Sequence, residues 1–545
     1  MESSGDFAQL TNEYLADLYA AEPVMATARG VHDYDGRLPD PGRFAAADDL
    51  RRCRAYLHAI DRLSLSSMTP DERIDCRLAR ADTQMRILDH EQVRRRERQP
   101  SVHVDTVAFA VYLLLSRDFA PVARRAESAL SRLRAVPEYL HQARENLSNP
   151  PRVHVEAAME AATGAETYLR ETVPAFAEPQ GACGTAMAEA ARYAADAVAD
   201  YRRYLSEVVL PNAGDDFALG EELFDYTLRV GMFLKETGAE LVEMARKTLE
   251  STRREMASTA NSIDPGSSWE QVVHDLKRRH PAAGGLVAAW RDEMERARQF
   301  VIERGLVTMP PNESLSVTET PPFQRATLPY AAYVPPAPFE ENQQGIFWVT
   351  PVDESASVDA RERQLQGHSL YNLPIIALHE AYPGHHLQFT TANRHPSRFR
   401  RHFADSNLFI EGWALYCEEM MHEQGFYADP RVRLMQLRNQ LWRACRVIID
   451  VEMHARRISF NDAVRLLVEE AKLEEVHARA EVRRYAANPT QPLTYLTGKR
   501  QILALRERAE KRKGSRFDLR AFHDQLLAYG AVPPRILHES MFAVD

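Results

Sequence analysis

The sequence has few of the features that would place this protein outside the ordinary globular class. Its five cysteines are scattered over 545 residues and form no C-x-x-C pair, so we expect neither a disulfide framework nor a thiolate zinc site. It contains no run of about 18 apolar residues that could span a membrane. The first residues are polar and acidic, unlike a secretory signal. These absences favour a cytoplasmic protein with no membrane partner.

The chain also carries fewer basic than acidic residues. Acidic residues outnumber lysine and arginine by 78 to 68, which gives a formal net charge of −10. A nucleic-acid-binding protein normally carries a basic surface, so we expect no nucleic-acid partner. The charge predicts nothing about the fold, and the oligomeric state stays open.

Apolar spacing predicts a mostly α fold. Over residues 6–306, apolar residues recur three and four positions apart, as on one face of a helix. This periodicity lapses over residues 308–351, where residues 325–333 and 345–350 are predicted as two strands of a small sheet. Helical spacing returns near Leu373 and continues to the end. We therefore divide the chain into a helical region, residues 1–306, and a catalytic region, residues 307–545, with the sheet at about 325–351.

The strongest chemical signal is His379-Glu380, which is followed by His385 and His386. The chain contains four His-Glu dipeptides, but only this one precedes two further histidines and follows an apolar run. Two histidines can share a zinc ion only if their nitrogens converge to about 2.0–2.1 Å from it. The motif H-E-x-x-H achieves this on a regular helix, but Pro383 stands where its second histidine would be.

A regular helix through this segment could not form a metal site. His385 would lie about 9 Å along the axis from His379 and on another face, and His386 would lie about 10.5 Å away. Pro383 clashes with the carbonyl four residues before it and breaks the helix, and Gly384 relaxes the backbone. A break here would bring His385 to His379. We therefore expect His385 as the second ligand and His386 beside the site, with the reverse assignment as the alternative.

A third ligand and a general base complete the predicted zinc site. Glu411 lies 26 residues after His385, on a segment that predicts the next helix, and Glu418 follows it as a neighbour of the ligands or substrate. His379, His385 and Glu411 would leave the open position that catalytic zinc requires. Glu380 would then act as the general base on a water molecule at the single zinc ion.

These motifs resemble a known family. H-E-A-Y-P-G-H-H-L-Q at 379–388, E-G-W-A-L-Y-C-E at 411–418 and P-T-Q-P-L-T-Y-L-T-G-K at 489–499 are similar to the domain of unknown function 885 family, bacterial proteins regarded as zinc metallopeptidase-like. The resemblance covers nearly the whole chain. The family is similar in plan to helical gluzincin carboxypeptidases and oligopeptidases, whose Gly-His-Ala-Leu aligns with residues 384–387 and favours His385.

The resemblance has implications for the fold and for catalysis. It implies a large helical ellipsoid with a deep cleft, a small antiparallel sheet beside the active site, and residues 1–306 as one wall or lid. Related peptidases donate a hydrogen bond to the developing oxyanion from the C-terminal part of the chain. Tyr495 is the first candidate here, followed by Arg484 and Tyr485, although each of them could simply pack a turn.

Further polar residues lie on the predicted helix after Glu418. Arg443 and Arg446 could bind a substrate carboxylate, and roles in ion pairs are at least as plausible. Asp450 and His454 are one turn apart and could form a second ligand pair, but an internal polar contact is favoured.

Taken together, these residues predict a zinc-dependent metallopeptidase that cleaves amide bonds of short peptides or peptide-like molecules. Two alternatives stay open. The same site could hydrolyse a non-peptide amide or ester in secondary metabolism, or the fold could be a non-catalytic scaffold that binds peptides.

Overall fold

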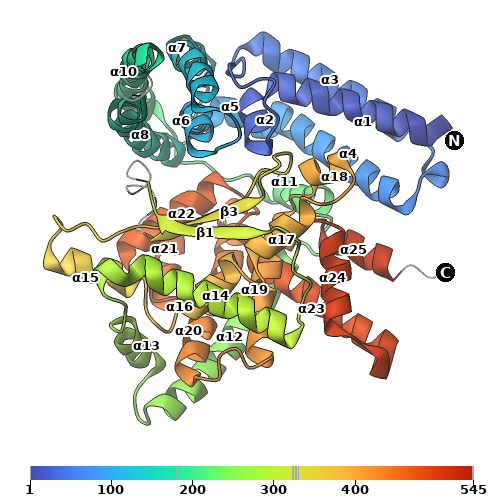
Figure 1. Ribbon diagram of the computed structural model, residues 1–545, viewed down its shortest axis with the longest axis vertical. Coiled ribbons are helices and arrows are strands. Elements are labelled where there is room, and N and C mark those ends of the chain that lie inside the picture. The colour runs from blue at the N-terminus through green and yellow to red at the C-terminus, as the bar shows by residue number, and fades with distance from the viewer. Residues whose placement is uncertain (1, 178–180, 322–324, 326–327, 329, 543–545) are drawn as a thin grey trace. The chain divides into compact units, whose positions relative to one another are not determined.

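The computed structural model describes residues 2–177, 181–321, 325, 328 and 330–542. The chain forms two compact units (Figure 1). The first comprises residues 1–218 and 337–342, and the second comprises residues 219–336 and 343–545. The predicted helical character is confirmed. Among the described residues, no helix is long and apolar enough to cross a membrane.

The first unit is built from helices. In this unit α7 packs lengthwise against α10 and also contacts α6, while α3 packs against α4. Its helices are α1 (Glu2–Ala21), α2 (Pro23–Arg29), α3 (Arg43–Asp61), α4 (Pro70–Leu88), α5 (Arg95–Arg98), α6 (Ser101–Ser116), α7 (Val122–Asn146), α8 (Arg152–Thr167), α9 (Val173–Ala177) and α10 (Gly181–Tyr204).

The second unit contains the remaining helices and the only sheet among the described residues. Its helices are α11 (Glu221–Tyr226), α12 (Gly238–Ile263), α13 (Trp269–Lys277), α14 (Leu286–Arg304), α15 (Val358–Gln366), α16 (Leu373–Glu380), α17 (His385–Ala392), α18 (Arg398–Phe403), α19 (Asn407–Glu423), α20 (Pro430–His454), α21 (Phe460–Glu470), α22 (Glu475–Ala487), α23 (Thr494–Lys513), α24 (Leu519–Ala528) and α25 (Pro534–Met541).

Buried helix pairs form the core of the second unit. The longest contacts join α12 to α20 and α19 to α23. Helix α19 is almost entirely buried along its length, and Trp413 and Tyr416 are fully buried on it. The start of α20 is defined by the Asp429 carboxylate, which accepts a hydrogen bond from the Arg431 amide, and by Pro430 in the first turn. This rigid core holds the helices that carry the predicted site.

The sheet has three strands, β1 (Ser314–Glu319), β2 (Ala331–Val334) and β3 (Gln344–Val349), in the order β1-β3-β2. β2 is antiparallel to β3, but β1 is parallel to it. The prediction of an antiparallel sheet was therefore wrong: the sheet is mixed. Sequence patterning missed β1 because its apolar residues are interrupted by serine and threonine and it lacks the aromatic pair of β3. Residues 326–327 and 329 of the predicted first strand lie outside the described residues.

The division between the two units also differs from the boundary predicted at residue 306. Residues 219–306 belong to the second unit because α12 packs along α20, and α14 packs against α16 and the strands β1 and β3 (Figure 1). Residues 211–220 contain turn-forming residues, but several other breaks in the helical region do too, so this one did not stand out as a boundary. The wall or lid role of residues 1–306 stays a prediction.

Candidate metal centre

The helix that carries the His-Glu motif is broken at the predicted place. α16 ends at Glu380 and α17 begins at His385, and the Tyr382–Pro383 peptide bond between them is cis. The Trp413 indole of α19 donates a hydrogen bond to the Pro383 carbonyl, at 2.8 Å. This hydrogen bond connects the bend to α19.

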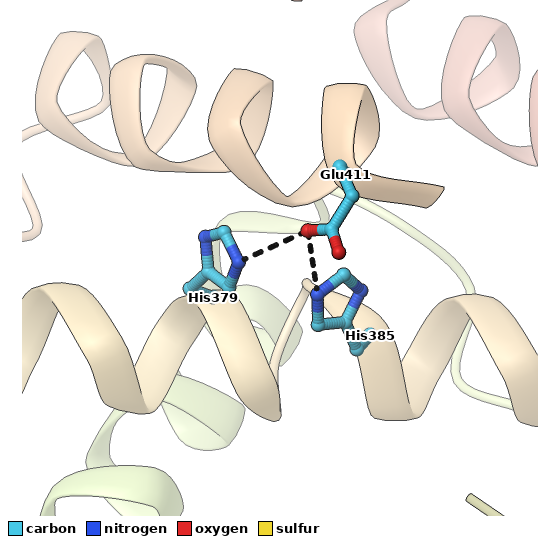
Figure 2. A group of neighbouring side chains, drawn as sticks. All are labelled: His379, His385 and Glu411. Carbon is cyan, nitrogen blue, oxygen red and sulfur yellow. Dashed lines mark ion pairs between the residues drawn. The ribbon is translucent and has the colours of Figure 1, made fainter. Parts of the chain in front are cut away.

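The break brings three polar side chains together. Nε2 of His379 lies 3.8 Å, and Nε2 of His385 3.4 Å, from Oε2 of Glu411. One ligand atom from each residue lies within 4.8 Å of the others. Figure 2 shows the two imidazoles projecting from the two halves of the broken helix toward Glu411 on α19. Within the described part of the chain, this is the only group of three or more such residues with metal-binding spacing.

A fourth residue orients His379. Nδ1 of His379 donates a hydrogen bond of 2.8 Å to Oε1 of Glu418, a carboxylate that is 1% exposed and lies two turns after Glu411 on α19. Burial alone would lower the pKa of His379, but Glu411 and Glu418 raise it to about 9. Because Glu418 occupies Nδ1, Nε2 is the nitrogen that faces Glu411. Metal-binding histidines are commonly oriented in this way by a carboxylate.

His386 points away from the cluster. Its fully buried ring donates from Nε2 to Oε2 of Glu313, at 3.0 Å, and Nδ1 accepts a hydrogen bond of 3.1 Å from the Tyr333 hydroxyl of β2. Glu313 also accepts hydrogen bonds from Tyr382, at 2.6 Å, and Arg298, at 3.0 Å. Burial opposes ionisation of Glu313, but these three partners lower its pKa to about 2. His386 and Tyr382 thus anchor both sides of the bend to one carboxylate.

Glu313 had no recognisable signal in the sequence. It lies immediately before β1, outside every motif, and meets His386 across 73 residues of chain. Only tertiary packing reveals it.

Glu380 is the last residue of α16 and is half-buried. Its negative charge acts on both His379 and Tyr333, so its carboxylate lies near the cluster. No residue that the structure describes forms a hydrogen bond or ion pair with this carboxylate. Its position beside the histidines and its lack of a partner suit a group that exchanges protons.

The three predicted oxyanion donors are not equivalent. Arg484 and Tyr485 bind Oε2 of Glu481, at 3.0 and 2.6 Å, so both are held in an internal network. The Tyr495 hydroxyl has a single long contact, 3.5 Å from Nε2 of Gln491. Burial raises the pKa of Tyr495, and the Glu411 carboxylate raises it further. Tyr495 is therefore the one of the three that lies near Glu411 without a strong partner.

The remaining polar residues on α20 have mainly structural contacts. Arg446 pairs with Glu481 at 3.2 Å. Asp450 accepts a hydrogen bond of 3.1 Å from the Thr490 amide, and Nε2 of His454 donates to the Tyr485 carbonyl, at 3.1 Å. Asp450 and His454 thus form internal polar contacts, as favoured above.

The helices that present Glu411 and Tyr495 approach closely at two glycines. A Cβ atom on Gly412 would lie 2.5 Å from the carbonyl carbon of Gly498, and one on Gly498 would lie 1.9 Å from the Leu408 carbonyl oxygen. Only glycine permits this separation between α19 and α23. The two residues therefore set the distance between the helix that carries the glutamate ligand candidate and the helix that carries the tyrosine.

Gly384→Ala is expected to disrupt the cluster. A Cβ atom at this position would lie 1.8 Å from the His379 carbonyl oxygen, so α16 and α17 would have to separate. We expect a stability loss of about 1–3 kcal/mol from overpacking together with weaker zinc binding, measured by thermal unfolding and chelator competition. Gly284→Ala is the matched control because it meets open space. Unchanged zinc affinity in Gly384→Ala would show that the bend does not position the ligands.

The fold and the cluster define a mostly helical protein in which two histidines of a broken helix converge on one glutamate of α19. The chain belongs to the family described as bacterial protein of unknown function (DUF885), whose model matches residues 23–541. No significant match was found among curated proteins.

Solved structures share the whole fold. A candidate lipoprotein of unknown function from Shewanella oneidensis is 26% identical, with a TM-score of 0.82 over 98% of this chain and 99% of that one. A candidate lipoprotein from Colwellia psychrerythraea is 19% identical, with a TM-score of 0.83 over 99% of both chains. The second likeness concerns the fold alone. The cytoplasmic location of this chain stays a prediction.

Proposed function

We propose that this protein is a zinc-dependent hydrolase that cleaves amide bonds of short peptides or peptide-like molecules. The observation that carries the proposal is the convergence of His379, His385 and Glu411, whose ligand atoms lie within 4.8 Å of one another. The convergence depends on the helix break between Glu380 and His385. A break between two buried helical segments loses backbone hydrogen bonds, and the arrangement that results brings together three side chains of the types that bind zinc.

The residues present fit a catalytic zinc ion. Two imidazole nitrogens and one carboxylate oxygen form a donor set that zinc hydrolases use, and three protein ligands leave a position for water or substrate. The hydrogen bond from His379 to Glu418 is the support that such ligands usually have. When bound, zinc would polarise the substrate carbonyl and make water easier to deprotonate.

The chain's own residues would carry out the proton transfers. Glu380 would take a proton from the attacking water and later deliver it to the amine nitrogen as the C–N bond breaks. The Tyr495 hydroxyl would donate a hydrogen bond to the substrate oxygen as it gains negative charge in the tetrahedral intermediate. The products are a carboxylate and an amine, so the step requires no cofactor beyond the metal.

Digestion of a peptide mixture with and without a chelator tests the proposal. The protein supplied with zinc is incubated with di- to pentapeptides, and the products are identified by mass spectrometry. We expect cleavage that stops on chelation and returns when zinc is restored. His385→Ala protein, purified in parallel, controls for contaminating peptidases. Intact peptides together with cleaved aryl esters or amides would instead favour a non-peptide substrate, and no zinc bound would support the scaffold alternative.

A further inference from the structure

Helix α20 carries two arginines without an acidic partner. Its other three arginines each pair with a carboxylate: Arg431 with Asp429, Arg433 with Glu255 and Glu419, and Arg446 with Glu481. Among the residues that the structure describes, no carboxylate lies within ion-pair distance of Arg438 or Arg443.

Arg443 is the more deeply buried of the two. Arg443 is 6% exposed. Its Nε atom is buried without a hydrogen-bond partner, and Nη1 donates a hydrogen bond of 3.3 Å to the Asn439 carbonyl of the same helix. Arginine is almost never buried this far unless it is paired, because an unpaired buried charge is costly. An anion that binds here from outside the chain would explain why Arg443 is buried without an acidic partner.

The second arginine lies close by. The guanidinium carbons of Arg438 and Arg443 lie 5.7 and 5.5 Å from the ring centre of Trp442. Burial and the positive charge of Arg443 together lower the pKa of Arg438 to about 10. Two buried positive charges that act on each other favour a bound anion, since each one raises the energetic cost of the other until an anion binds.

Arg443 also lies near the metal-ligand cluster. The guanidinium carbon of Arg443 lies 5.8 Å from the ring centre of Tyr495, the proposed oxyanion donor. The negative charges of Glu418 and Glu411 also act on Arg443. A substrate that reached His379 and His385 would therefore be exposed to the positive charge of a buried guanidinium beside Tyr495.

We propose that Arg443, assisted by Arg438, binds the C-terminal carboxylate of the substrate, so that the protein releases residues from the carboxyl end of short peptides. This inference rests on the proposed function for the cleavage step, but not for carboxylate binding. A bidentate guanidinium–carboxylate contact supplies the missing anion and fixes the register of the peptide relative to the metal ligands.

Calorimetric titration of the zinc-supplied Glu380→Gln protein tests the binding step without turnover. Three probes are compared: an acetylated tripeptide with a free C-terminal carboxylate, the same peptide as its amide, and an amidated tripeptide that ends in glutamate. We expect the free acid to bind about 30-fold or more tightly than either amide. Adding Arg443→Gln should abolish this preference, Arg443→Lys should restore part of it, and Arg431→Gln, on the exposed part of the same helix, should leave it unchanged.

Kinetics of the otherwise unaltered enzyme give a second readout. Arg443→Gln should raise KM for the free-acid peptide by a much larger factor than KM for the amidated peptide. Equal binding of acid and amide, or a preference that survives Arg443→Gln, would overturn the inference. Binding of the glutamate amide as tight as that of the free acid would overturn its C-terminal assignment.

A structural role for Arg443 beside Glu418 is the alternative to carboxylate binding, and the same variants distinguish the two. Oε2 of Glu418 is buried without a hydrogen-bond partner, so Arg443 could serve Glu418 instead of a substrate. In that case Arg443→Gln would weaken zinc binding and leave the acid-to-amide preference intact, which would refute the inference. A carboxylate preference without any peptide hydrolysis by the zinc-loaded protein would refute the proposed function and leave carboxylate binding by Arg443 standing.

Discussion

Glu380→Gln is expected to keep zinc bound and to lower kcat by about 10²–10⁴-fold, the usual contribution of a general base. Glutamine has nearly the same shape but cannot accept the proton of the attacking water. The carboxylate of Glu380 has no partner among the described residues, so its replacement breaks no hydrogen bond of the fold. The change is measured by peptide hydrolysis at saturating substrate, with zinc content determined on the same preparation.

A second His-Glu dipeptide provides the matched control for this variant. Glu423 follows His422 and is the last residue of α19, as Glu380 is of α16. It pairs with Arg506 at 2.6 Å, so Glu423→Gln removes one partly exposed ion pair, worth up to about 1 kcal/mol, and should retain activity. Normal turnover by Glu380→Gln would remove Glu380 from the mechanism, while loss of zinc would make it a ligand or a support for one.

Zinc binding is expected to be lost in His385→Ala and Glu411→Ala and retained in His386→Ala. Each of the first two changes removes one of three ligands, whereas His386 points to Glu313 and Tyr333. Glu418→Gln should give an intermediate result, with affinity lowered about 10–100-fold, as expected for a residue that orients a ligand. Zinc content per chain and competition with a coloured chelator measure these effects.

The control for the ligand series is His422→Ala, a histidine on α19 outside the cluster. The buried contacts of His386 mean that its replacement will lower stability, so each variant is also followed by thermal unfolding. Loss of zinc from a stably folded His386→Ala protein, with zinc kept by His385→Ala, would reverse the ligand assignment. Zinc retained by every variant would place the metal elsewhere in the molecule.

The sequence predicted the helical class and the broken helix for physical reasons that are local. Apolar spacing reports which helix faces are buried, and Pro383 cannot continue a helix because it clashes with the carbonyl four residues earlier. The choice of His385 over His386 followed from the same break. In the structure His385 faces Glu411 and His386 faces away.

Other features could not be predicted because they depend on contacts between distant segments. β1 pairs in parallel with β3, and nothing in its short polar sequence indicates a partner about 30 residues away. The extent of the second unit is set by packing of α12 on α20, which helical periodicity alone does not reveal. Glu313 belongs to no motif, yet it holds both Tyr382 and His386.

The sequence by itself determined which residues could bind a metal, because ligand type, spacing and the helix-breaking Pro383-Gly384 pair are all local properties. Only the tertiary structure decided which arginines lack an acidic partner and which tyrosine is left near Glu411. The sequence does not distinguish Arg443 from Arg446, or Tyr485 from Tyr495. They differ because Glu481 satisfies Arg446 and Tyr485, and a long-range ion pair exists only once two helices have packed together.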